Sequence, residues 1–111
     1  MFVKHSSDGF LTPIDGIEMK TLVYGEKSLL TRFHLKKGSE LPAHSHPHEQ
    51  TGFLVSGKMT LYIDKESFYV EPGDSWSIQG DVEHRADVME DSVAIEVFSP
   101  VRKDYLPKEN V

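Results

Sequence analysis

Short runs of β-branched, aromatic and leucine residues alternate along this chain with turn-forming pairs such as Asp15-Gly16, Lys37-Gly38 and Gly80-Asp81. No window keeps an apolar period of about 3.6 residues for three turns, so we expect no helix. Short strands between frequent turns predict an all-β fold, an antiparallel sandwich or barrel. The apolar runs place strands at Ile17–Tyr24, Ser28–Lys36, Thr51–Val55, Lys58–Asp64, Ser67–Glu71, Trp76–Gln79, His84–Val88 and Ser92–Ser99.

The length of the chain, 111 residues, predicts a single domain over residues 1–111. We expect the N-terminal segment 1–16 and the C-terminal tail 105–111 to lie outside the core motif region. The tail carries Pro107 and charged residues, so we expect it to be loose. The sequence Asp64-Lys65-Glu66-Ser67 joins two apolar runs and is typical of a hairpin connection.

Composition and charge narrow the function classes. The formal net charge is −6 and the longest basic run is Lys36-Lys37, which argues against a nucleic-acid partner. No apolar run approaches the length of a membrane span, and Met1–His5 does not resemble the start of a signal peptide. We therefore expect no membrane partner and a cytoplasmic location. The chain has no cysteine, so any metal must be held by nitrogen and oxygen.

The strongest chemical signal is the segment His44–Gln50, which holds three of the six histidines. Imidazole is the commonest side-chain metal ligand, and amides and carboxylates supply oxygen, so this segment indicates part of a metal site. Alternation places its histidines and Gln50 on one face, although Pro47 interrupts a regular strand. The best candidate for a further donor is His84, at the start of a predicted strand after the Gly80-Asp81 turn.

The last predicted strand carries an acid and an aromatic side chain. Glu96 and Phe98 alternate with Ile95 and Val97, and Arg102 follows just after. If the two aliphatic residues pack in the layer behind, Glu96 and Phe98 face the barrel interior. An interior carboxylate near a cation is a candidate acid–base group, and an arginine offers a bidentate grip on a substrate carboxylate. The alternative is an ordinary surface ion pair on an edge strand.

The spacing of glycines and histidines resembles the first motif of the cupin family. Five residues separate Gly38 from His44-x-His46, and three residues separate His46 from Gln50. A further six residues lie between Gln50 and Gly57. The cupin motif normally has Glu at the place of Gln50. The resemblance implies a small antiparallel jelly-roll β-barrel, which agrees with the strand pattern.

The second cupin motif is present in weaker form. Gly73, ten residues and His84 resemble it, and the fifteen residues between Gly57 and Gly73 match the spacing of compact microbial cupins. The resemblance covers about Gly25 to Ser99. Three other positions depart from the motif, where the usual Pro, Gly and Asn are replaced by Gln79, Asp81 and Val88.

The resemblance implies four metal ligands, which are His44, His46, Gln50 and His84. Glu49 would be the acidic ligand if the loop shifted by one residue, but Gln50 keeps both gaps of the motif. His48 is expected beside the site rather than as a ligand. Because all four ligands are neutral, a divalent ion would keep its full charge and act as a stronger Lewis acid. The set suits one divalent transition metal, Zn, Ni, Fe, Mn or Cu.

The end of the chain sharpens this resemblance. Glu96, Phe98 and Arg102 are similar to the tail of small pectin-degradation cupins of the KdgF type. Members of that family convert 4,5-unsaturated uronates, released by polysaccharide lyases, into linear keto sugars, and they have a His, His, Gln, His metal site. The acid in that family is usually Asp, so Glu96 is about one methylene longer.

The resemblance implies a metal-dependent enzyme acting on a small, anionic, sugar-like substrate, with linearisation of unsaturated uronates as the leading hypothesis. Glu96 would move the proton for enol-to-keto conversion and ring opening, Arg102 would hold the carboxylate, and Phe98 would pack against the sugar ring. Two alternatives stay open: a cupin dioxygenase acting on an enediol or phenolic substrate, and a non-catalytic metal- or sugar-binding cupin. Small cupins are often homodimers, so we expect a homodimer, with Met1–Ile14 as a candidate contact.

Overall fold

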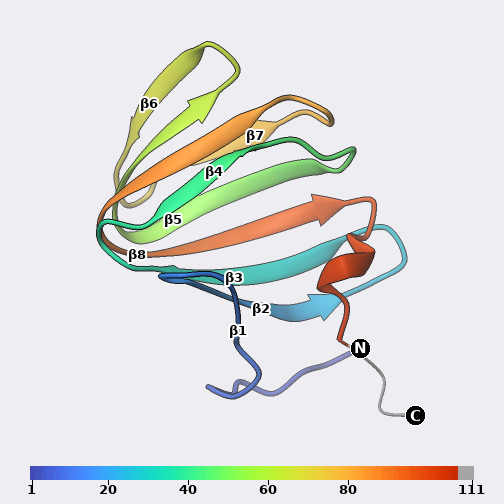
Figure 1. Cartoon of the computed structure of the whole chain (residues 1–111). Helices are drawn as coiled ribbons and strands as arrows, with labels where there is room; N and C mark the ends of the chain where they lie inside the picture. The colour runs from blue at the N-terminus through green and yellow to red at the C-terminus, as the bar shows by residue number, and fades with distance from the viewer. Residues whose placement is uncertain (108–111) are drawn as a thin grey trace.

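The computed structural model describes residues 1–107 and consists mainly of β-strands (Figure 1). We expected no helix, and this part of the chain has a single 3-10 turn, η1 (Lys103–Tyr105). Within residues 1–107, no helix has the length and apolar character that crossing a membrane requires. The strands of this part are β1 (Leu11–Ile14), β2 (Ile17–Tyr24), β3 (Leu29–Leu35), β4 (Glu40–His44), β5 (Glu49–Ile63), β6 (Glu66–Val70), β7 (Ser75–Ile78) and β8 (His84–Ser99).

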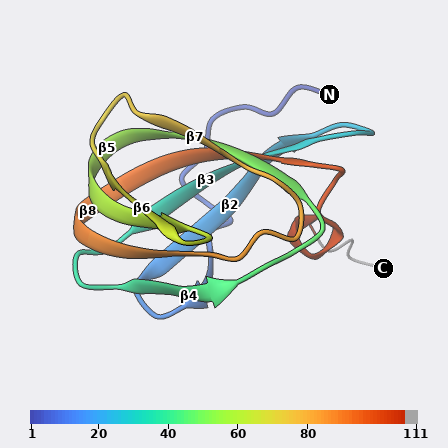
Figure 2. The same cartoon turned by 90° about the horizontal axis from the view of Figure 1, so that it is seen from above.

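The strands form an antiparallel jelly-roll barrel with two facing layers, as predicted (Figure 1, Figure 2). β5 and β8 contain 15 and 16 residues and run through both layers. The first half of β5 pairs with β7 and with the second half of β8, which also pairs with β3. The second half of β5 pairs with the first half of β8 and with β6, and the first half of β8 also pairs with β4. The site described below lies between these two layers.

A bulge at Gly57 bends β5 where the strand passes from one layer to the other. The bulge also changes which side chains of β5 point into the barrel. Leu54 is buried before the bulge, whereas Met59 and Leu61 are buried after it, so the inward side changes from even to odd positions. The pairing with β8 shifts register over the same residues, as an inserted residue requires. Gly57 has φ +95°, and a Cβ there would collide with Ser92, so a side chain is excluded.

The structure joins two pairs of predicted strands into β5 and β8. Gly57 was expected to be a turn, but the strand continues through it because β8 pairs with β5 on both sides of the bulge. The hairpin at Asp64-Lys65 is confirmed by the pairing of Ile63 with Glu66. The sequence pattern does not predict β1 and β4, because each is an edge strand that contains a proline, Pro13 or Pro42.

The last described residues pack on the barrel rather than leaving it. Tyr105 and Leu106 contact the core, and the Tyr105 ring meets the Phe98 ring edge-on, with centroids 5.3 Å apart. The Thr21 hydroxyl donates a hydrogen bond to the Tyr105 carbonyl. The prediction of a loose tail is therefore wrong for Tyr105 and Leu106. Residues 108–111 of that predicted tail lie outside the described part of the chain.

Candidate metal centre

Three histidines from two distant segments meet at one end of the barrel. His44 ends β4, His46 follows in the β4–β5 loop, and His84 begins β8. The pairing of β4 with β8 sets His44 opposite His84, and their ring centroids are 4.2 Å apart. The Asp81 N–H donates to the His46 carbonyl at 2.7 Å, which ties the two loops together. One ring nitrogen of each histidine lies within 4.8 Å of the others, so the cluster is positioned to bind a metal ion.

Backbone carbonyls set the orientation of all three imidazoles. The Nδ1 atom of each ring lies 2.8 to 3.0 Å from a carbonyl oxygen, that of Pro42 for His44, of His48 for His46 and of Val82 for His84. A carbonyl oxygen can only accept, so each Nδ1 carries the proton and donates it. The Nε2 atoms then keep their lone pairs, which is the tautomer that a metal ligand needs.

Two features of this cluster fit a bound cation. His84 Nε2 is buried and has no hydrogen-bond partner among residues 1–107. His46 Nε2 lies 3.0 Å from Gln50 Oε1, and both are acceptors because His46 donates through Nδ1. Burial lowers the pKa of His84 to about 4, and burial together with the charge of Arg102 lowers the pKa of His46, so a second proton on either ring is disfavoured. Three imidazoles and one amide oxygen suit a divalent transition metal.

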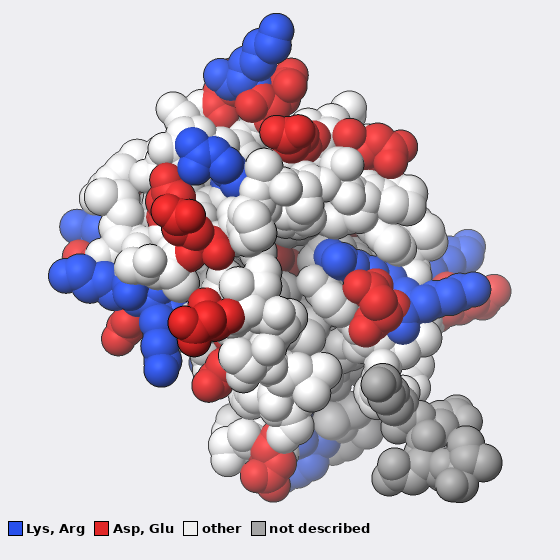
Figure 3. Space-filling model, in the orientation of Figure 1, with Lys and Arg blue, Asp and Glu red and all other residues white. Residues whose placement is uncertain are grey.

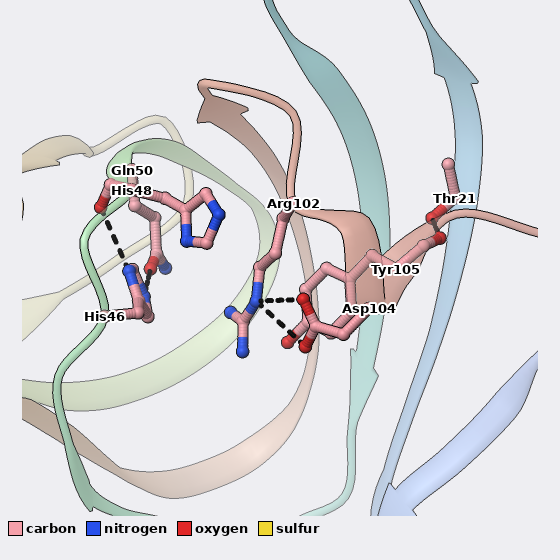
Figure 4. Close-up of polar contacts among 7 residues, drawn as sticks. All are labelled: Thr21, His46, His48, Gln50, Arg102, Asp104 and Tyr105. Atoms are coloured by element: carbon pink, nitrogen blue, oxygen red, sulfur yellow. Dashed lines mark hydrogen bonds and ion pairs between the residues drawn. The ribbon is translucent and has the colours of Figure 1, made fainter.

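The structure separates the neighbours Glu49 and Gln50. Gln50 is 5% exposed and its amide contacts His46, whereas Glu49 is exposed. Alternation along β5 explains this, since adjacent side chains point to opposite faces. Figure 4 shows His48 beside His46 and Gln50; its backbone carbonyl accepts from His46, and its ring centroid lies 5.6 Å from that of His46. The predicted set of four donors is thus brought together by the fold.

Glu96 and Phe98 face the barrel interior. They are 9% and 1% exposed, and β8 lies between β3 and β5 rather than at an edge, so the alternative of a surface ion pair on an edge strand is wrong for Glu96. Both line a cavity with mainly apolar walls, whose polar side chains belong to His44, Gln50, His84, Glu96, Arg102 and Tyr105. In the space-filling view the molecule is hollowed between its layers, with acidic and basic side chains interspersed around this face (Figure 3).

The Glu96 carboxyl is held by hydrogen bonds rather than by direct contact with a cation. Its Oε1 accepts from Gln50 Nε2 at 2.7 Å and from Trp76 Nε1 at 3.1 Å. Burial raises the pKa of Glu96 to about 7, although both hydrogen bonds and the charge of Arg102 oppose the rise. At neutral pH the carboxyl is therefore present in both protonation states, which suits a group that gives and takes a proton.

The raised pKa of Glu96 predicts a pH-dependent cost to stability in the metal-free protein. Between the unfolded pKa of 4.5 and the folded pKa of about 7, the folded chain binds more protons, so its stability falls as pH rises through this range. Glu96→Gln removes this loss. We expect its free energy of unfolding, relative to wild type, to rise by about 3 kcal/mol between these pH values. Urea denaturation with a chelator present measures it.

The exposed Glu66 provides the matched control for this titration. Glu66→Gln is expected to follow the wild-type pH dependence, because that side chain is not buried. An unchanged difference between Glu96→Gln and wild type across the same pH range would contradict the assignment of the raised pKa to Glu96. Contributions from His84 are present in every variant and cancel in the difference.

Arg102 reaches the cavity from the segment that follows β8. Its Nε donates to both carboxylate oxygens of Asp104, at 3.1 and 3.2 Å, and its guanidinium carbon lies 4.0 Å from the Tyr105 ring centre. Figure 4 shows the side chain lying between the histidine-rich loop and Asp104. These contacts hold a cation beside the cavity that Glu96, His44 and His84 also line.

Sequence reasoning missed two residues of this site, Trp76 and Tyr105. The Trp76 indole crosses Gly52, its partner on β5, and reaches Glu96, which is 20 positions away in sequence. Tyr105 lines the cavity beside Arg102. Trp76 is the single tryptophan of the chain, but its link to Glu96 depends on the pairing of β7, β5 and β8, which no local pattern encodes.

Comparisons with known proteins agree with this geometry. The family described as Cupin domain matches residues 31–99. The chain is 28% identical over 94 residues to the pectin degradation protein KdgF of Dickeya dadantii (strain 3937), a match that covers 83% of this chain and 86% of that protein.

Solved structures extend the similarity to almost the whole chain. The structure of KdgF from Halomonas sp. has a TM-score of 0.89 and 26% identity, with 96% of this chain and 100% of that chain covered. An RmlC-like cupin from Shewanella frigidimarina NCIMB 400 also has a TM-score of 0.89, at 22% identity and with 96% of each chain covered. The latter similarity concerns the fold alone. The resemblance that the motif spacing predicted is confirmed by these matches.

Proposed function

Since this chain belongs to the Cupin domain family and is similar to KdgF proteins over most of its length, we propose that it is a metal-dependent enzyme that linearises 4,5-unsaturated uronates. The name of the Dickeya relative refers to pectin degradation, which supports a uronate substrate. The observation that carries the proposal is the buried Glu96 carboxyl, which lines the same cavity as Arg102, His44 and His84.

Four neutral side chains would hold the metal in this proposal, His44, His46, Gln50 and His84. The metal, one of Zn, Ni, Fe, Mn or Cu, would supply Lewis-acid polarisation of a substrate oxygen. The carbonyl partners of the three Nδ1 atoms would keep the imidazoles in the ligating tautomer.

The remaining residues would bind the sugar and move protons. Arg102 would pair with the substrate carboxylate, and Phe98, whose ring lies 5.2 Å from the Arg102 guanidinium carbon, would pack against the sugar ring. Opening the hemiacetal breaks the bond between the anomeric carbon C1 and the ring oxygen. The C1 hydroxyl loses its proton and becomes an aldehyde carbonyl, while the ring oxygen takes up a proton and becomes the hydroxyl of an enol at C5. Addition of a proton at C4 and loss of the enol hydroxyl proton then give the ketone, so the conversion is an isomerisation. Glu96 would transfer this proton, because its carboxyl is protonated in part at neutral pH.

A direct assay tests the proposal. The purified, metal-loaded protein is incubated with unsaturated galacturonate, and the loss of ultraviolet absorbance from the conjugated double bond is followed. We expect acceleration over buffer without oxygen uptake. An absence of acceleration with each of the five metals would contradict the uronate reaction, and oxygen uptake would favour the dioxygenase alternative.

The Arg102→Lys variant tests the role of the guanidinium in this assay. Lysine keeps the charge but loses the planar fork, so we expect KM to rise about 10- to 100-fold, with a smaller change in kcat. Arg85→Lys is a matched control. Arg85 also contacts an aromatic ring, Tyr62 at 3.6 Å, and a carboxylate, Asp87 at 3.3 Å. It directly follows His84 on β8, so alternation directs its side chain to the opposite face. An equal KM for both variants would contradict the assignment.

Homodimerisation and a cytoplasmic location stay predictions from the sequence. Size-exclusion chromatography with light scattering measures the first.

A further inference from the structure

One oxygen of Glu96 connects three residues of the site. Glu96 Oε1 accepts from the Gln50 side-chain amide at 2.7 Å and from the Trp76 indole N–H at 3.1 Å. The other end of the Gln50 amide, Oε1, lies 3.0 Å from His46 Nε2. A continuous polar chain therefore runs from Trp76 through Glu96 and Gln50 to His46, and all of its side chains except Trp76 are buried.

The orientation of the Gln50 amide decides whether this residue can bind a metal. The amide oxygen can bind a metal ion, whereas the amide NH₂ group has no lone pair to offer. In the reversed orientation the NH₂ hydrogens would point toward the histidines. When Glu96 is ionised, the reversed amide would also place its oxygen against Glu96 Oε1, two acceptors in contact. The contact with Glu96 thus favours the orientation in which Gln50 Oε1 faces His46.

Glutamine makes this contact with the ionised form of Glu96, whereas the ionised glutamate that the cupin motif normally carries does not. An ionised glutamate has only acceptor oxygens and cannot donate to Glu96. Two carboxylates at this distance would repel each other, and one of them would keep a proton. A glutamine satisfies both neighbours, because it offers an acceptor to the cluster and a donor to Glu96.

Glycine at position 52 makes room for the indole that holds Glu96. Gly52 lies between Trp76 on β7 and Glu96 on β8 in the sheet register. A Cβ at this position would collide with the indole atoms of Trp76, including Nε1. The glycine thus allows the indole to cross β5 and donate to Glu96.

We propose that Glu96, held by the Trp76 indole, orients the Gln50 amide so that its oxygen faces the metal-binding histidines, which makes Trp76 and Gly52 positioning residues of the metal centre. The inference rests on the proposed metal site. It gives Glu96 a role toward Gln50 that is independent of its role in proton transfer. The two roles separate by substitution, because an amide oxygen accepts the same hydrogen bonds as a carboxylate but does not serve as the acid–base group.

Zinc titration in competition with a chromophoric chelator tests the proposal without an activity readout. We expect Glu96→Ala to weaken Zn²⁺ binding about 10- to 100-fold and Glu96→Gln to stay within about threefold of wild type. Circular dichroism checks that each variant is folded. Equal affinities of folded Glu96→Ala and wild type would overturn the proposal. A wild-type protein that binds none of Zn²⁺, Ni²⁺, Fe²⁺, Mn²⁺ and Cu²⁺ would instead contradict the proposed metal site itself.

Substitutions of Gly52 and Trp76 provide a second test of the proposal, which remains available if Glu96→Ala does not fold. Trp76→Ala and Gly52→Ala should each weaken Zn²⁺ binding about fivefold, the loss that one hydrogen bond accounts for. In the Trp76→Ala background, Gly52→Ala should cause no further loss, because there is no indole to displace. Additive losses, or wild-type affinity in both single variants, would overturn the positioning role of this pair.

Discussion

Replacing His84 by alanine is expected to reduce the metal content of the purified protein from about one ion per chain to below a tenth of that. His84 is 2% exposed, and its buried Nε2 has no hydrogen-bond partner among residues 1–107, so this atom is available to bind a metal ion. We expect Zn²⁺ affinity to fall by more than about a hundredfold, since loss of a ligand exceeds the loss of a residue that orients one. Elemental analysis of protein purified without added chelator measures the content.

His48→Ala is the matched control for this substitution. It removes an imidazole from the histidine-rich segment but keeps the backbone carbonyl that accepts from His46. We expect its metal content to equal that of wild type. Full metal content in folded His84→Ala, or an equal loss in His48→Ala, would contradict the proposed ligand set.

The second large effect is expected in the rate of the uronate reaction. Glu96→Gln should lower kcat/KM about 100- to 10,000-fold, because the amide cannot transfer a proton. The metal content should remain that of wild type, since the amide oxygen still accepts from Gln50 and Trp76. Steady-state assays on metal-analysed protein measure both quantities together.

Two further variants serve as comparisons for this result, Glu96→Asp and Glu66→Gln. Aspartate keeps the acid but is one methylene shorter, so we expect an activity between those of wild type and Glu96→Gln. Glu66→Gln should be fully active, because Glu66 is exposed on β6. Activity of Glu96→Gln within about threefold of wild type would contradict the proton-transfer role.

Local patterns in the sequence are sufficient to predict much of the fold and to identify candidate ligands. Alternation in Leu29–Leu35 predicts its buried face because side chains on a strand alternate with a period of two. The gaps around His44, His46 and Gln50 place three donors on one short segment, and the absence of cysteine leaves nitrogen and oxygen as donors. Neutral ligands follow from residue identity alone. These conclusions need no knowledge of which strands are neighbours.

Tertiary structure decided which distant residues meet. Gly57 is a turn signal in the sequence, and only pairing with β8 on both of its sides makes it a bulge that exchanges the inward positions of β5. The register of β4 with β8 sets His84 opposite His44. Gly52 stands between Trp76 and Glu96 because three strands pair in one row. Register depends on the packing of the whole barrel. The sequence by itself therefore determined the candidate donors and the candidate acid, and the fold decided that Glu96 is buried, that Trp76 is its indole partner and how the Gln50 amide is directed.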